Sequence, residues 1–114
     1  ILESGLRYTM VDTVYVVETT LSGDLNEAEI GYWSQSMIDT KLVACVNIEK
    51  ITSIYRWEDK IESIPEWKVQ LFTTENSKNK VVSKIKSEHP YDIPKILCWA
   101  AESTKEYSHW VKGE

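Results

Sequence analysis

The stretch LVACVNIEKITSIYRWEDKIESIPEWKVQLFTT, residues 42–74, decides the fold because it predicts long strands joined by a hairpin. Residues 42–48 are apolar at almost every position, which is typical of a strand covered on both faces. Residues 51–57 continue the extended pattern, and residues 66–74 alternate apolar with polar side chains. The polar segment 58–65 between them predicts a hairpin link that is longer than a two-residue turn.

The flanking segments complete the order of elements. Residues 14–20 are rich in β-branched side chains and predict a strand before this stretch. Apolar residues recur at helical spacing on either side of the hairpin, which predicts one helix in each place. The two stripes are Ile30, Trp33, Met37 and Ile38, and Val81, Val82 and Ile85. Residues 94–101 predict a last strand, and residues 104–111 a short terminal helix.

Local signals predict where the helices begin and end. Ser22 or Asp24 is expected to cap the first helix, and Asn76 or Ser77 the second, because these side chains accept hydrogen bonds from free backbone N–H groups. His89 should end the second helix, since the residue before a proline is pushed out of the helical region.

The order strand, helix, strand, strand, helix, strand predicts an α+β fold of the ferredoxin-like, split βαβ type (βαββαβ) with a short C-terminal helix. Residues 14–114 are expected to form this single domain, because their number suits one hydrophobic core. Residues 1–13 are interpreted as an N-terminal extension or a remnant of cloning.

A second apolar face of the sheet predicts an oligomer. In the last strand Leu97 and Trp99 face away from the apolar residues expected in the core, and Phe72 and Tyr15 are expected to do the same in their strands. Because the uncovered face of such a sheet is polar in a monomer, we expect a second copy of the chain to cover it. The terminal helix is the rival cover within the chain.

Composition excludes several classes of protein. The net charge of −5 argues against a nucleic-acid-binding face, which needs clustered positive charge. No run of about 18 apolar residues is present, so a membrane span is not expected. The N-terminal residues lack the apolar core of a signal peptide, which favours a cytoplasmic protein in which Cys45 and Cys98 are free, buried thiols rather than a disulfide.

Three linked motifs resemble the CutA family, the divalent-cation tolerance proteins. They are the strand motif ACVNI, the segment SIYRW leading into KIE, and the corner HPYDIP, which lie in this order within residues 44–94. The Thr19-Thr20 pair and the spacing of Tyr107 and Trp110 also fit. The resemblance implies a ferredoxin-like domain that forms a tight homotrimer, with a long central hairpin reaching onto a neighbour. It also implies an architecture similar to that of PII-like signalling proteins, which bind small effectors between subunits.

The sequence departs from the family pattern at four positions. Thr73 stands where the family usually has lysine, and Lys95 where glutamate is common. Ala100 replaces a usual proline, and Asp59 a frequent glycine of the hairpin. The first two changes alter charge, so they bear on any ligand that is recognised by its charge.

Five residues form a candidate ligand cleft between subunits. Tyr55 and Trp57 are alternate residues of one strand, so they share a face and can form an aromatic wall. If the hairpin crosses to a neighbour, His89 and Tyr91 would form the opposite wall, and Lys60 would attract an anionic group. Packing between subunits is the alternative role for the two wall aromatics, and a helix stop is the alternative for His89.

Cys45 and His89 are the candidate metal ligands. A thiolate with an imidazole suits copper, although Cys45 also fits as a small core residue. No nucleophile or phosphate-loop signature is present, so we expect no enzyme. The sequence thus predicts a cytoplasmic homotrimer involved in the response to divalent metal ions, with copper as candidate ligand and neither nucleic acid nor membrane as partner. The alternative is a PII-like signalling module that binds a small anionic metabolite in the intersubunit cleft.

Overall fold

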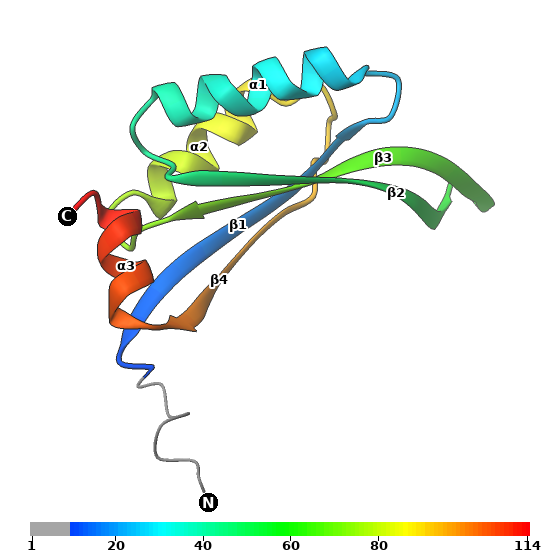
Figure 1. The fold of residues 1–114 in the computed structure, drawn as a ribbon. Helices are drawn as coiled ribbons and strands as arrows, with labels where there is room; N and C mark the ends of the chain where they lie inside the picture. The colour runs from blue at the N-terminus through cyan, green and yellow to red at the C-terminus, as the bar shows by residue number, and fades with distance from the viewer. Residues whose placement is uncertain (1–9) are drawn as a thin grey trace, which may run out of the picture.

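The computed structural model describes residues 10–114, which form one four-stranded antiparallel sheet and three helices. The elements are β1 (Asp12–Ser22), α1 (Glu27–Asp39), β2 (Cys45–Trp57), β3 (Lys60–Thr73), α2 (Lys78–Glu88), β4 (Ile96–Ser103) and α3 (Lys105–Lys112). The sheet order is β2-β3-β1-β4, which confirms the predicted α+β fold (Figure 1). Of the predicted extension, residues 1–9 lie outside the described residues, and β1 begins before its predicted start.

The hydrophobic core lies between the sheet and helices α1 and α2, which both cover one face (Figure 1). Its buried members are Val17, Leu21, Ile30, Met37, Val43, Trp67, Val69, Leu71, Val81 and Ile85. Both predicted helical stripes therefore face the core. The indole N–H of Trp67 donates a hydrogen bond to the carbonyl oxygen of Leu25 at 2.9 Å, which fixes the loop before α1 on the sheet.

The start of α1 differs from the prediction. Asn26 is the N-cap: its side-chain oxygen accepts a hydrogen bond from the Glu29 N–H at 2.8 Å, and the Glu29 carboxylate accepts one from the Asn26 N–H at 2.9 Å. This reciprocal pair is a capping box, so the predicted caps Ser22 and Asp24 were wrong. Ser77 does hold the N-cap position of α2, although its side chain makes no capping hydrogen bond.

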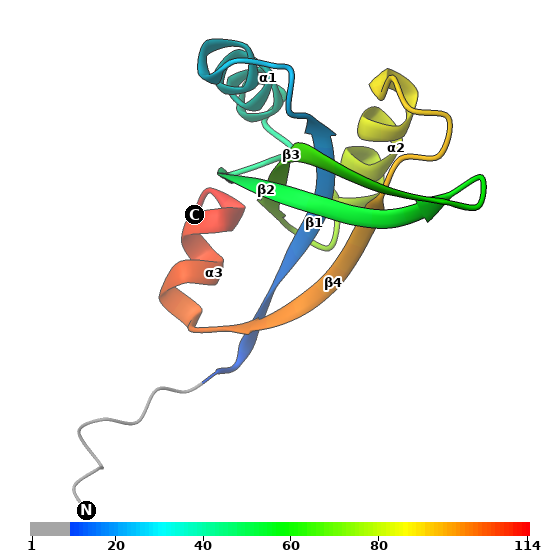
Figure 2. The same cartoon turned by 90° about the vertical axis from the view of Figure 1, so that its right-hand side faces the viewer.

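The central hairpin is longer and its turn tighter than predicted. Trp57 pairs with Lys60, so the turn consists only of Glu58 and Asp59, whose φ angles are 50° and 64°. The prediction of a longer link over residues 58–65 was wrong, because most of that segment belongs to β3. The hairpin projects beyond the rest of the chain (Figures 1 and 2).

The strand predicted to be covered on both faces is instead an edge strand. β2 begins at Cys45, three residues later than predicted, and pairs only with β3. Val46 is half-buried, and residues 47–50 are exposed. The apolar composition of this segment therefore reflects burial only in part, since Val43 lies in the core, with Leu42 and Val46 packed against it.

Helix α3 covers one end of the opposite face of the sheet. It lies on the side away from α1 and α2 (Figure 1), where Val14 and Val16 of β1 and Val111 of α3 are buried outside the main core. Leu97 and Trp99 of β4 remain 48% and 39% exposed. The rival cover predicted within the chain thus accounts for only part of this face.

Tyr15 was placed on the wrong face by the prediction. It lies two positions from the core residue Val17, and the ammonium of Lys78 in α2 lies 4.1 Å from the centre of its ring. Phe72 pairs with Val16, so it does belong to the opposite face.

Among residues 10–114, no helix combines the length and apolar content needed to cross a membrane.

Candidate functional site

An open cleft of about 620 Å³ lies beside the hairpin. Figure 2 shows the course of the backbone there, where the segment between α2 and β4 passes the sheet. Three alternate residues of β2 and three of β3 form its floor, and the α2–β4 segment forms its side. The lining residues are Thr20, Ser53, Tyr55, Trp57, Glu62, Ile64, Glu66, Tyr91, Asp92, Ile93 and Lys95.

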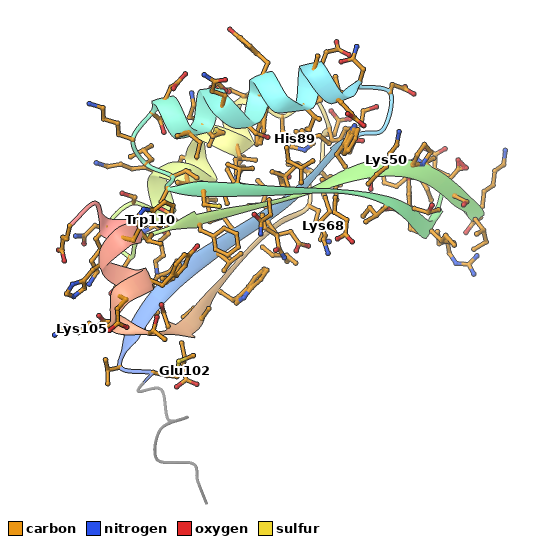
Figure 3. All side chains as sticks on the ribbon, viewed as in Figure 1. Lys50, Lys68, His89, Glu102, Lys105 and Trp110 are labelled. Atoms are coloured by element: carbon orange, nitrogen blue, oxygen red, sulfur yellow. The ribbon has the colours of Figure 1, made fainter. Side chains whose placement is uncertain are left out.

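Strand pairing explains why these residues converge. Tyr55 pairs with Glu62, and Ser53 pairs with Ile64, so all four point to the same face of the hairpin. This face continues the sheet surface that α1 and α2 leave uncovered. In Figure 3, Lys50 and Lys68 mark the two faces of the sheet, with Lys68 on the uncovered one.

His89 holds the corner that carries one side of the cleft. The Tyr91 N–H donates to His89 Nδ1 at 3.1 Å, so Nε2 carries the ring proton and donates to the Thr20 carbonyl oxygen at 2.7 Å. The two aromatic rings of this corner meet edge to face, with their centroids 4.7 Å apart. Both ring nitrogens are therefore engaged in fixing the corner to the end of β1.

Tyr91 and Glu66 link the corner to the floor of the cleft. The Tyr91 hydroxyl donates a hydrogen bond to Glu66 Oε2 at 3.0 Å, and Glu66 is only 6% exposed. Burial, followed by this hydrogen bond and the charge of Glu66, raises the pKa of Tyr91 from 10.0 to about 12. The hydroxyl therefore remains a donor across the physiological range.

A charged network borders the cleft on the uncovered face. Lys95 Nζ lies 2.7 Å from one oxygen of Glu18, and the Gln70 amide donates to the other oxygen at 2.9 Å. Burial by itself raises the pKa of Glu18, but these two partners outweigh it and leave the pKa below the usual value. On the same face Lys68 pairs with Glu49 at 3.1 Å, which raises the pKa of Lys68.

Three of the five predicted cleft residues line the same cavity within one chain. Tyr55, Trp57 and Tyr91 come together, although the predicted cleft lay between subunits, with the hairpin of one reaching the corner of another. Lys60 lies beside the turn and is not among the lining residues. His89 supports the corner from behind and instead lines a smaller pocket of about 170 Å³ beside α1 and α2.

The structure does not bring the two predicted metal ligands together. Cys45 begins β2 opposite Phe72, which in turn pairs with Val16 of β1, whereas His89 contacts Thr20, four residues further along β1. The thiol of Cys45 lies 3.7 Å from the side-chain oxygen of its neighbour Asn47. Within residues 10–114, no three His, Cys, Asp or Glu side chains are grouped closely enough to hold a metal ion.

Sequence reasoning missed the acidic lining of the cleft. Glu62 and Ile64 were assigned to the polar link 58–65 and Glu66 to the strand that follows it, so the strand face that all three share went unseen. Strand alternation counted back from Trp67 would have placed all three on the face away from Trp67. That is the face that also carries Tyr55 and Trp57. Asp92 lies within the HPYDIP corner and carries no periodic signal.

The fold and sequence match known proteins over nearly the whole described chain. The family model of the CutA1 divalent ion tolerance protein matches residues 15–114. The divalent-cation tolerance protein CutA of Thermus thermophilus is 33% identical over 81 residues, which cover 69% of this chain and 79% of that protein.

Two solved structures show the same fold. CutA from Synechococcus elongatus superposes with a TM-score of 0.81 at 28% identity, covering 94% of this chain and 92% of that one. A structure from Nostoc, described as a PII-like protein CutA in apo form, gives a TM-score of 0.77 at 24% identity, covering 87% and 94%. With the family model matching all but the first residues, this chain belongs to the CutA1 divalent ion tolerance family.

Proposed function

We propose that this chain is a non-catalytic, homotrimeric binding module that takes part in the cellular response to divalent metal ions. The observation that carries the proposal is the aromatic-walled cleft on the uncovered sheet face. Its volume of about 620 Å³ lies within the range of small-molecule sites. Membership of a divalent ion tolerance family supplies the biological setting.

Exposed apolar side chains support assembly into a trimer. They lie on both faces of the hairpin and on β4, and they are Ile54, Tyr55, Trp57, Ile61, Leu97 and Trp99. Apolar surface of this extent at a projecting element is typical of an interface between protein chains.

Native mass spectrometry of the purified full chain tests the proposal. We expect a species of three times the 13.2 kDa chain mass, with a retained small molecule or metal as additional mass. A monomer as the sole species at micromolar concentration would contradict the assembly. A bare trimer that no small molecule or metal stabilises in a broad thermal-shift panel would contradict the binding role.

Direct copper binding through Cys45 is the second candidate. The favouring observation is that Cys45 is only partly buried, on the uncovered face where a three-fold assembly can gather three thiols. Because both nitrogens of His89 make hydrogen bonds, the proposal rests on Cys45 alone.

Calorimetric titration with Cu⁺ under reducing conditions tests this candidate. The wild-type chain should bind copper stoichiometrically, and Cys45→Ser should abolish the binding. Cys98→Ser is the matched control, since it removes the other free thiol and should leave binding unchanged. Equal binding by wild type and Cys45→Ser would rule out this route.

The signalling alternative proposes that the cleft senses a small anionic metabolite. Lys95 is the favouring residue, because it is the one cationic side chain among the lining residues that the structure describes.

For the compartment we propose the cytoplasm, where a reducing environment would keep Cys45 and Cys98 as free thiols.

A further inference from the structure

We infer that the cleft selects an elongated organic cation, of the linear polyamine class. The inference rests on the proposed function, because it names the ligand class for the same cleft. The inferred ligand is cationic, whereas Lys60 had suggested an anionic ligand in the sequence analysis.

The charge of the lining favours a cation. Glu62, Glu66 and Asp92 contribute three carboxylates, and among residues 10–114 none of them takes part in an ion pair. Lys95 is the cationic lining residue, and its ammonium is already held by Glu18. A ligand in the cleft therefore meets a negative potential, which attracts ammonium groups and repels carboxylates or phosphates.

The aromatic walls act in the same direction. Tyr55, Trp57 and Tyr91 all line the cleft, and the negative faces of aromatic rings attract cations within about 6 Å. Tyr91 adds no negative charge at neutral pH, because its raised pKa of about 12 keeps it protonated. The methylene segments of a polyamine would also pack against such walls while its ammonium groups reach the carboxylates.

Glu66 supplies an acceptor for a cationic group in the cleft. It is 6% exposed, yet it receives one hydrogen bond, from Tyr91 to Oε2. Its other oxygen is not among the buried side-chain atoms that lack a partner, so it is accessible in the cleft and can accept a hydrogen bond from a charged donor there. An ammonium group is such a donor, with charge-assisted hydrogen bonds stronger than neutral ones.

The spacing of the carboxylates requires an elongated ligand. Glu62 and Glu66 lie on the same strand face four residues apart, which corresponds to roughly 13 Å between their backbones. A single metal ion cannot bridge two side chains at this separation, whereas a linear amine with two or more ammonium groups can. The cleft volume of about 620 Å³ leaves room for such a chain.

Calorimetric titration of the full chain with spermidine tests the inference. Spermidine should bind saturably at low salt and more weakly at high salt, because the attraction is electrostatic. Suberate, a linear dicarboxylate of similar length, should not bind. Saturable binding of suberate in place of spermidine would overturn the inference and leave a ligand-binding cleft, as proposed above, intact.

Charge-removing variants locate the binding. Glu66→Gln and Glu62→Gln should each weaken spermidine binding about tenfold or more, as expected for the loss of a charge-assisted hydrogen bond. Glu75→Gln removes the same charge from an exposed position outside the cleft and should leave binding unchanged. Equal weakening by Glu75→Gln would assign the binding to net charge and overturn the inference.

A variant that removes a positive charge from the cleft should strengthen spermidine binding, which a misfolded chain would not do. Lys95→Gln removes the one cationic lining residue and should tighten spermidine binding while Glu66→Gln weakens it. Light scattering on each sample separates assembly from ligand choice. A trimer that binds neither spermidine nor suberate overturns the inference alone, whereas loss of the trimer in the wild type overturns the proposed function.

Discussion

Tyr91 joins two parts of the chain that are 25 residues apart, because its hydroxyl donates to the buried carboxylate of Glu66. In the folded state its pKa lies above the ordinary value of 10.0, at about 12. The protonated form thus contributes stability that is fully present below pH 10 and is lost as the pH rises toward 12.

We predict that Tyr91→Phe lowers the free energy of unfolding by about 1 kcal/mol at neutral pH, because Glu66 loses its donor. The gap between wild type and variant should shrink as the pH rises above 10. Urea unfolding at pH 8 and pH 11 measures it. Tyr32→Phe, at an exposed position of α1, is the control and should show no such gap. A gap independent of pH would contradict the assigned role of the hydroxyl.

At the scale of elements, two glycines have opposite roles. A Cβ at Gly23, in the turn after β1, would lie 2.4 Å from the carbonyl oxygen of Pro65, so only glycine fits there without a backbone shift. A Cβ at Gly31, within α1, would meet nothing within 4 Å. The first glycine is required by a close approach, while the second only weakens its helix.

We therefore predict that Gly23→Ala destabilises the chain by about 2 kcal/mol or more, as expected for overpacking against backbone. Gly31→Ala should stabilise it by up to about 1 kcal/mol, the difference in helix propensity. Urea midpoints of the two variants measured side by side check both signs. A stabilising Gly23→Ala would show that the turn can open without cost.

The turn of the hairpin shows why part of the element pattern escaped sequence reasoning. Glu58 and Asp59 both adopt positive φ, a conformation that glycine, asparagine and aspartate favour and glutamate does not. Without that signal the turn was drawn too long. Both strands were still predicted, because apolar content and alternation survive an error at the turn.

The candidate site was predictable to the same extent. Tyr55, Trp57 and Tyr91 were found because aromatic side chains stand out at any register. Glu62 had been assigned to the link, so its face could be assigned only with the shorter turn, whereas the face of Glu66 already followed from its neighbour Trp67 in the predicted strand. The capping role of Asn26 was missed for a similar reason, since the helix start depends on where the preceding turn ends.

At the scale of the whole molecule, the hairpin is the expected anchor of the assembly. Trp57 is 53% exposed near its tip, and buried tryptophans are frequent energetic centres of interfaces. We predict that Trp57→Ala shifts the trimer toward monomer by at least about 2 kcal/mol of association free energy. Sedimentation across a dilution series measures the shift.

Tyr32→Ala is the matched control for that experiment, because it truncates an aromatic side chain that is 79% exposed on α1. It should leave the association constant unchanged. A trimer equally stable in both variants would assign Trp57 to the wall of the cleft alone.

The projecting hairpin also has a consequence for the motions of the free chain. Residues 54–61 are all exposed, and beyond the sheet body the two strands hydrogen-bond only to each other. Their amide protons should therefore exchange with solvent far faster than those of β1, where core packing resists opening. A neighbour that clasps the hairpin would slow this exchange, so the tip amides would report subunit contact in a protein whose core remains unchanged.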